Sequence, residues 1–549
     1  MCNYFNDYFG NITTSLNIDN NHEIVCYDRR PNELAPILTD ITVNDTLCYI
    51  NKLKNSCSSG IDDVQSRSVK CVSESIAEVL TYLINLSLRS GVFPDALKIA
   101  RVTVIFKQGD RNSVENYRPI SILPVFSKLY ERAFCDKIGA YLFAKIFSKF
   151  QYGFVPHSST EYALLQLKEK LLSHIERNST NCTTLLIDFR KAFDCANHDV
   201  ILFKAHHYGM QGNTLEFLRS YLQNRQQLVQ IEESRSQNCN LKCGVPQGSI
   251  LGPILFLLLV NDLVAYLQDS ETDILLYADD STIICKGTSP DKVHRVATNA
   301  LERLSRWCSK NRMMVNSKKT KALSIGFSRK NSPALFYNDE PIEYVENSKI
   351  LGVYFDSKLN FAKHVEYLRK CISWKIGLLH RLRNYLPKIV KIRIYHALIN
   401  SQLYYCHLIW GNSTCKLNLR SLHVLQKSCL RAIYNTPYLS HTAPLFLESK
   451  ITQIPDMFLC KLLSTLHKQD TKFFTLFDLK INVSNFHLRC INLYTIPSSR
   501  LKKTDESLSV IIPKVLNYFH ANNIVIFFIG QSQLKRIVDD HLASIRCCF

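Results

Sequence analysis

Apolar residues follow two different periods along this chain, and these periods predict its strands and helices. Short runs rich in β-branched residues predict strands at 102–106, 183–187 and 228–231, and a hairpin across 273–286. Between them, helical spacing predicts helices at about 72–89, 160–176, 196–208, 214–223, 250–266 and 291–311. Beyond about residue 360 the pattern is almost wholly helical. Strands and helices mixed around a central hairpin indicate an α+β fold.

Two stretches depart from these periods. Residues 1–40 are polar and rich in asparagine, with weak periodicity, and we expect a loosely ordered leader there. The longest apolar run in the middle of the chain, 250–260, contains Gly252 and Pro253. That run is shorter than the roughly 20 residues that cross a bilayer, so we expect no membrane partner.

Composition narrows the class of protein. A chain of 549 residues is too long for one compact core, and its 46% hydrophobic and 21% charged residues are typical of globular domains. The formal net charge of +20 favours a polyanionic partner such as nucleic acid. The 20 cysteines are dispersed without zinc-ligand spacing, and we expect free thiols in a reducing compartment.

Carboxylates stand at the ends of two predicted strands. The segment Tyr277–Asp280 lies between apolar runs, which predicts a hairpin with Asp279 and Asp280 at its tip. Asp188 follows the strand 183–187 directly, and the hairpin could pair with that strand. Clustered carboxylates hold hard divalent cations, so these side chains could bind two Mg²⁺ ions. Ordinary turn and helix-capping aspartates remain the alternative on this pattern alone.

Two further elements suit phosphate and base contacts. Lys107 ends the strand 102–106, and Arg118 stands before a proline in an extended segment, so both could grip phosphate oxygens. The glycine-bearing loop 244–253 permits close backbone approach to a ligand and leads directly into a helix. Taken singly, these features are also compatible with solvated surface charges and a plain loop.

These elements occur in an order and at separations that resemble one family. The matching segments are 58–62, 116–121, 151–154, 188–194, 244–253, 277–280, 316–321 and 351–353. In these segments the chain resembles the reverse transcriptases of non-LTR (LINE-type) retrotransposons, nearest the jockey-like and chicken-repeat-like groups. The resemblance extends from about residue 45 to at least residue 450.

The resemblance implies a right-hand polymerase fold of fingers, palm and thumb, with an antiparallel palm sheet and a mainly helical C-terminal region. Residues 1–44 would be a leader or linker remnant, and 45–180 the fingers with an N-terminal extension. Residues 181–335 would form the palm, 336–437 the primer grip and thumb, and 438–549 a C-terminal region without an assigned role.

The resemblance also implies roles at the metal site. Asp188, Asp279 and Asp280 would be the catalytic carboxylates and metal ligands, and the backbone carbonyl of Phe189 would complete the metal shell. The cofactor would be two Mg²⁺ ions, with Mn²⁺ as a substitute. Lys319 is the best candidate to protonate the leaving pyrophosphate, while two neighbours stay open as alternatives: Lys318 and Lys321.

Substrate contacts follow from the same resemblance. Lys107 and Arg118 would grip the incoming triphosphate, and Gln247 and Gly248 would contact the nucleotide and template. Phe193 matches the steric gate that excludes a ribose 2′-OH, the group that separates RNA precursors from DNA precursors. The partners would be an RNA template, a DNA primer or target, and dNTPs, in the cytoplasm and nucleus.

The stretch 363–393 fits a thumb that tracks a nucleic-acid backbone. Nine lysines and arginines face the single acid Glu366, opposite a stripe of Val365, Leu368, Ile372, Ile376, Leu379 and Leu382. A basic amphipathic helix could also lie on a membrane, but the surrounding motifs favour nucleic acid. We expect Trp374 and Trp410 in the core rather than stacked on bases.

Two departures from the family leave other readings open. Val155-Pro156-His157 stands where an arginine is usual, and we expect the chain to lack the endonuclease that family members normally carry. A group II intron-type maturase with reverse transcriptase would need a maturase segment that is not recognisable here. A decayed polymerase that only binds RNA or DNA is the remaining alternative. The pattern does not indicate an oligomeric state.

Overall fold

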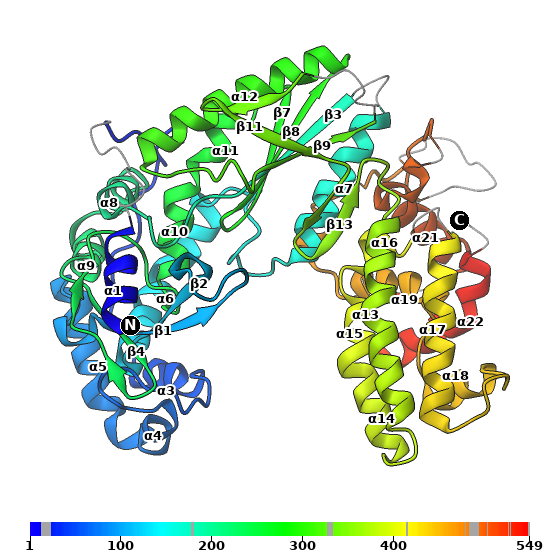
Figure 1. Ribbon diagram of the computed structural model, residues 1–549, viewed down its shortest axis with the longest axis horizontal. Helices are drawn as coiled ribbons and strands as arrows, with labels where there is room; N and C mark the ends of the chain where they lie inside the picture. Colours follow the sequence, from blue (N-terminus) through cyan, green and yellow to red (C-terminus); the bar gives the residue numbers. More distant parts are fainter. Residues whose placement is uncertain are drawn as a thin grey trace.

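The protein forms an arch with a β-sheet at its top and one leg on each side (Figure 1). The computed structural model describes residues 1–12, 23–176, 181–326, 333–412, 416–477, 479–482, 493–501, 503–524, 526–527 and 529–546. The first leg comprises N-terminal helices and a small sheet, and the second leg consists of a short hairpin followed by the helices after residue 360. Mixed sheets and helices are therefore confirmed.

The sheet at the top of the arch has six strands in the order β10-β11-β9-β3-β8-β7. They are β3 (Asn181–Ile187), β7 (Thr272–Tyr277), β8 (Asp280–Gly287), β9 (Lys321–Ile325), β10 (Leu335–Tyr337) and β11 (Glu340–Val345). Helices cover both faces. Ile283 and Cys285 share a core with α12 (Pro290–Asn311), whereas Ile284 between them packs with α7 (Thr160–Glu176). Burial on both faces explains why the hairpin strands read as continuous apolar runs.

The first leg carries a five-stranded sheet in the order β2-β1-β4-β5, with β6 also paired to β4. Its strands are β1 (Ile99–Phe106), β2 (Tyr117–Ile122), β4 (Gln226–Ile231), β5 (Ser234–Arg235) and β6 (Cys239–Asn240). The surrounding helices are α3 (Val43–Asn51), α4 (Ser66–Cys71), α5 (Ser73–Ser90), α6 (Val125–Tyr141), α8 (His198–His207), α9 (Gly212–Leu222) and α10 (Gly252–Val260), whereas α11 (Asp262–Leu267) lies against β7 and α12 of the upper sheet. Gly91, with φ +69°, ends α5 in the left-handed conformation that glycine permits.

The second leg begins with a hairpin of β12 (Asn347–Ile350) and β13 (Val353–Asp356) and continues almost entirely as helices. These are α13 (Ala362–Arg381), α14 (Lys388–Ile394), α15 (Ser401–Tyr404), α16 (His407–Trp410), α17 (Lys416–Tyr434), α18 (Ala443–Ser449), α19 (Ile454–His467), α20 (Thr471–Phe474), α21 (Leu508–Ala521) and α22 (Gln531–Arg546). Their core is continuous with α7. The sequence-based helical pattern beyond residue 360 is confirmed.

Helix α7 ties the second leg to the upper sheet through three glutamates. The Glu169 carboxylate accepts hydrogen bonds from the Leu508 and Ser509 amides at the start of α21, at 2.9 and 3.3 Å. Glu161 pairs with Lys461 of α19 at 2.8 Å, and Glu176 accepts the Leu501 amide at 3.2 Å. The C-terminal region is therefore docked on α7 rather than standing apart from it.

Two expectations were wrong. Residues 2–10 are not a loose leader but helix α1 (Cys2–Gly10), because apolar side chains at helical spacing, including Phe5 and Phe9, are buried against the sheet of the first leg. Trp374 is 69% exposed, because it lies on the face of α13 opposite the buried stripe that contains Ile372 and Ile376. Trp410, in contrast, is fully buried as expected.

The predicted strands and helices of the first 311 residues are confirmed to within a few residues, and α10 and α11 together fill the helix expected over 250–266. Within the described part of the chain, none of the helices combines the length and apolar character needed to cross a bilayer. The described cysteines are free thiols, as expected.

Candidate active site

Strand register brings the predicted carboxylates to one edge of the upper sheet. In the antiparallel pair β3–β8, Ile187 lies opposite Ser281, so Asp188 comes next to Asp280. Residues so placed on neighbouring antiparallel strands have Cα atoms about 5 Å apart. Tyr277 pairs with Asp280 across the hairpin, which leaves Ala278 and Asp279 as its two-residue turn. The predicted hairpin and its pairing with the strand of Asp188 are both confirmed.

The segment before β9 holds the backbone of Asp188. The Asn316 amide donates to the Asp188 carbonyl at 2.7 Å, and the Thr320 hydroxyl accepts from the Asp188 amide at 3.3 Å. Lys319 lies in the turn between these two contacts, where its amide donates to the Asn316 carbonyl at 3.1 Å. Lys319 is therefore placed beside Asp188 by backbone hydrogen bonds.

Gln151 holds the turn that carries Asp279, and the sequence reasoning gave it no role. Its buried side-chain oxygen accepts hydrogen bonds from the Ala278 amide at 3.0 Å and the Gly153 amide at 2.8 Å. A Cβ atom on Gly153 would lie 2.3 Å from the Ala278 nitrogen, so only glycine permits this approach. The match at 151–154 was a signal that could have pointed to this role.

Burial and mutual repulsion oppose ionisation of the turn carboxylates. Burial raises the pKa of Asp280 to about 6, and the charges of Asp279 and Asp188 act in the same direction. Burial likewise raises the pKa of Asp279, with Asp188 adding to the effect, while Arg118 and Lys107 oppose it. These interactions place the three carboxylates in one electrostatic cluster with cations around it.

The cations come from β1, β2 and the turn before β9. Lys107 follows β1, and its amide donates to the Asn116 carbonyl at 2.8 Å, which closes the loop between the two strands. Arg118 pairs with Ile105 within this ladder. Partial burial lowers the pKa of Lys107, and the nearby charges of Arg118 and Lys319 lower it further. Three predicted basic residues therefore share one electrostatic environment with the carboxylates.

The loop 244–253 closes another side of the site. Its backbone approaches β2: the Gln247 carbonyl accepts from the Ser121 amide at 3.0 Å, and a Cβ on Gly248 would lie 2.2 Å from the Ser121 carbonyl oxygen. The Gln247 side-chain amide donates to Asp194 at 2.8 Å. Burial raises the pKa of Asp194 to about 6. The close approach of the Ser121 carbonyl is therefore enough to explain why position 248 requires glycine. The predicted contact of Gly248 with a ligand stays a prediction.

The turn that follows β3 carries two phenylalanines, Phe189 and Phe193. Phe193 is half-buried and stacks on Phe256 with ring centroids 4.5 Å apart, while Phe154 meets its edge at 6.2 Å. Phe189 is buried, and its backbone forms a bridge to Val315. The Phe193 ring is therefore held by packing.

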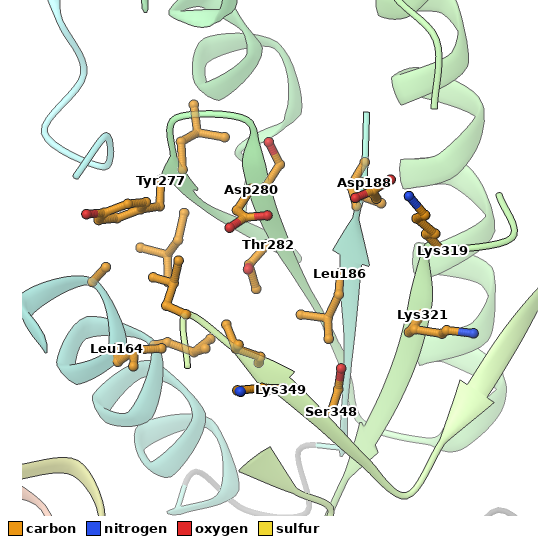
Figure 2. A pocket seen from close by; sticks show the side chains of 18 residues that line it. Leu164, Leu186, Asp188, Tyr277, Asp280, Thr282, Lys319, Lys321, Ser348 and Lys349 are labelled. Carbon is orange, nitrogen blue, oxygen red and sulfur yellow. The ribbon is translucent and has the colours of Figure 1, made fainter. Parts of the chain in front are cut away.

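A cavity of about 180 Å³ opens beneath the carboxylates, between the upper sheet, α7 and the β12–β13 hairpin. Figure 2 shows Asp188 beside Lys319 on one side of it, with Asp280 facing them from the hairpin. Leu164 and Leu186 form apolar walls, and Ser348 and Lys349 lie toward the far end. Leu351, which lies within the predicted primer grip and thumb (336–437), also lines this cavity.

The oxygen ligands at this edge of the sheet are of the chemical type that binds Mg²⁺. Asp188, Asp279 and Asp280 offer carboxylate oxygens, the ligands that hard divalent cations prefer. Among the described residues, however, no three acidic, histidine or cysteine side chains lie close enough to form a ready-made metal cage. The three aspartates therefore provide the right chemistry without a closed coordination shell.

The structure thus brings together most of the predicted site residues: Asp188, Asp279, Asp280, Lys107, Arg118 and Lys319 around the turn, with Phe193, Gln247 and Gly248 on the adjoining loop. Besides Gln151, two residues of this site were given no role from the sequence: Asp194, which binds Gln247, and Lys191, whose charge also lowers the pKa of Lys107. Asp194 lay within the matched segment 188–194, but its bond to Gln247 depends on the folded loop.

Comparison with known proteins gives a consistent picture. Residues 105–355 match the family described as reverse transcriptase (RNA-dependent DNA polymerase). The chain is 26% identical over 436 residues to the RNA-directed DNA polymerase from mobile element jockey of Drosophila funebris, covering 78% of this chain and 47% of that protein. It is 29% identical over 432 residues to the probable RNA-directed DNA polymerase from transposon BS of Drosophila melanogaster, covering 74% and 46%.

A third relative is the Pol polyprotein from type-1 retrotransposable element R1 of Bradysia coprophila, with 26% identity over 377 residues, 68% of this chain and 37% of that protein. The predicted resemblance to jockey-like elements is confirmed. The chain spans about half the length of the jockey relatives it matches.

Proposed function

We propose that this chain, which carries a reverse transcriptase domain similar to those of jockey-type mobile elements, is an RNA-directed DNA polymerase. It extends a primer 3′-OH with dNTPs on an RNA template. The observation that carries the proposal is the register of β3 and β8, which sets Asp188 beside the Ala278–Asp279 turn within reach of three cations. An edge with clustered acids ringed by Lys and Arg suits a metal–triphosphate complex.

Asp188, Asp279 and Asp280 would hold Mg²⁺, or Mn²⁺ in its place, with the Phe189 carbonyl as a further ligand. Two such ions supply activation of the attacking hydroxyl and charge neutralisation at the leaving oxygen when they are bound. The raised pKa values of Asp279 and Asp280 support this assignment, since carboxylates that repel one another are stabilised by a cation between them.

Lys107 and Arg118 bind the triphosphate oxygens from the β1–β2 side, and Lys319 protonates the pyrophosphate as it leaves. Lys319 is favoured over Lys321, because Lys321 pairs with Glu343 and points away from Asp188 (Figure 2). The Lys319 side chain, in contrast, lies beside Asp188. Its fixed turn lets it donate a proton without a large rearrangement.

Phe193 selects the sugar, and Gln247 with Gly248 supports the nucleotide from the adjoining loop. The Phe193 ring is pressed against Phe256, so it cannot retreat to make room for a 2′-OH. Gln247 is anchored on Asp194, which fixes the loop beside this ring. The Phe193 ring would therefore exclude a 2′-OH sterically, and its packing on Phe256 keeps it in place.

The arch is compatible with a right hand, in which the first leg forms the fingers, the upper sheet the palm and the second leg the thumb. The domain limits are those expected above. Residues 363–450 carry 14 lysines and arginines and 2 acids, a net 14 − 2 = +12 of the whole chain's +20. This charge, with Trp374 exposed on α13, supports binding of the template–primer backbone by the second leg.

Primer extension on an RNA template tests the proposal. Wild type is expected to incorporate dNTPs in a Mg²⁺-dependent manner, and Asp279→Asn to lose this activity while keeping its thermal stability and template–primer affinity. Asp291→Asn, an exposed residue at the start of α12, serves as the matched control and is expected to behave as wild type. A folded wild type that binds template–primer without extending it would refute the polymerase assignment in favour of a binding remnant.

A further inference from the structure

Helix α1 lies outside the region matched to the reverse transcriptase family, yet it packs against the sheet that carries Arg118. Phe5 and Phe9 are buried against Val102 and Val229 of β1 and β4. Asn6, also buried, donates to the Gln237 carbonyl at 2.8 Å and accepts from Gln227 at 3.1 Å. Apolar and polar contacts together fix both the position and the rotation of α1 on the sheet.

The same helix reaches the turn that follows Asp188. The Lys191 ammonium lies over the Tyr8 ring at 5.6 Å from its centroid, within the range of a cation–π contact. Burial, together with the charges of Glu115 and Asp194, raises the pKa of Tyr8 to about 12. Tyr8 is therefore close to the acid that anchors Gln247 as well as to Lys191.

Lys191 also connects the turn 188–194 to β2. It has a left-handed backbone with φ +46°, and its ammonium approaches the Tyr117 carbonyl at 3.5 Å. Tyr117 immediately precedes Arg118, and its ring meets the edge of Phe5 at 5.0 Å. Helix α1 thus contacts both residues that link the carboxylate turn with the arginine strand.

We propose that α1 positions the nucleotide site and that Tyr8 is its key positioning residue. Tyr8 covers the Lys191 side chain on one side, which keeps the ammonium directed at the Tyr117 carbonyl. The distance between Arg118 and the turn 188–194 then stays constant when a triphosphate binds between them. This inference rests on the proposed polymerase function, since it assigns Tyr8 a role in dNTP binding rather than in chemistry.

Steady-state kinetics with Tyr8→Leu and Tyr8→Phe tests the proposal. Tyr8→Leu is expected to raise the KM for dNTP about 3- to 10-fold, as for loss of one cation–π contact, with kcat and template–primer affinity within about two-fold of wild type. Tyr8→Phe keeps the aromatic face and is expected to retain the wild-type KM. The control is Tyr4→Leu on the same helix, because Tyr4 is 64% exposed.

Hydrogen exchange provides a readout that does not depend on activity. In Tyr8→Leu, the amides of 117–121 and 188–195 are expected to exchange faster, with the exchange of α12 and α21 unchanged. If the wild type fails to extend a primer but this local change is seen, the polymerase proposal fails, while the structural part of the inference, that Tyr8 holds the turn 188–194 and β2 in place, stands. If the wild type extends a primer and Tyr8→Leu matches it in KM and in exchange, or if Tyr4→Leu shows the same shift, the positioning role is refuted.

Discussion

Gln151 offers the sharpest test of how this site is held together. One buried oxygen accepts the backbone amides of Gly153 and Ala278 and so joins the segment before α7 to the turn of Asp279. Two backbone hydrogen bonds beside it, from Tyr152 to Leu276 at 2.8 Å and from Leu276 to Phe150 at 2.9 Å, make the arrangement rigid. We predict that Gln151→Met, which preserves length and volume, damages both stability and catalysis.

The magnitude follows from the two donors that lose their acceptor. Leaving a buried amide unsatisfied costs about 1–3 kcal/mol. The substitution leaves two such amides but also removes one unpaired buried donor, the Gln151 side-chain nitrogen, so the net cost is expected to be about 1–3 kcal/mol if the backbone stays in place. If the turn moves instead to find another partner, the stability loss is smaller, but Asp279 moves with it. A displacement of about 1 Å in a reacting group can lower the rate about 100-fold. Stability and kcat are therefore coupled in this variant.

Urea unfolding and single-nucleotide incorporation measure the two effects on the same preparation. Gln402→Met is the matched control, because the buried side-chain oxygen of Gln402 accepts no hydrogen bond from any described residue. We expect the control to change stability by less than about 1 kcal/mol and to leave kcat unaltered. A Gln151→Met protein with the wild-type unfolding midpoint and the wild-type kcat would show that Gln151 does not hold the turn of Asp279.

Three further predictions concern separate parts of the molecule. Phe193→Val is expected to admit ribonucleotides, measured as the ratio of rNTP to dNTP incorporation; an unchanged ratio would remove Phe193 from the gate. Glu169→Ala is expected to cost about 2–4 kcal/mol and to speed proteolysis within α21, because Leu508 and Ser509 lose their buried acceptor; equal proteolysis rates would contradict this. Burial lowers the pKa of His407 to about 3, so the folded state cannot take up the proton that the unfolded chain binds below about pH 6.5. The stability contributed by neutral His407 is therefore present above pH 6.5 and is lost at about 1.4 kcal/mol per pH unit as the pH falls toward 3. In urea unfolding between about pH 7 and 5, His407→Gln is expected to reduce the dependence of the unfolding free energy on pH.

In helix α13 the apolar spacing predicts which side chains are buried and which are exposed. The buried stripe from Val365 to Leu379 was evident from apolar spacing, and it is buried as expected. The same spacing places Trp374 two residues from Ile372 and from Ile376, which is the opposite face of a helix. Trp374 was expected in the core because tryptophan is usually buried, whereas the helical period alone would have predicted an exposed side chain.

Helix α1 shows the opposite case. Residues 2–10 carry apolar side chains at helical spacing, but the segment is short and no helix was expected there, since a helix of nine residues has little stability of its own. Its order comes from the sheet of the first leg, whose apolar surface receives Phe5 and Phe9. Contacts between segments far apart in the sequence, such as Tyr8 with Lys191, lie beyond any local signal.

The strands, the helices and the residues at strand ends could be predicted from the amino-acid order alone, because side-chain periodicity and turn chemistry are local properties of the chain. Asp188, Asp279 and Asp280 were therefore recognisable from their positions after apolar runs and from the order of the motifs around them. Three contacts became visible only in the folded chain: Gln151 supports the hairpin turn, Asp194 anchors Gln247, and Tyr8 faces Lys191. Those contacts depend on the register of strands and on which helix faces meet, and both are set by burial across the whole fold rather than by neighbouring residues.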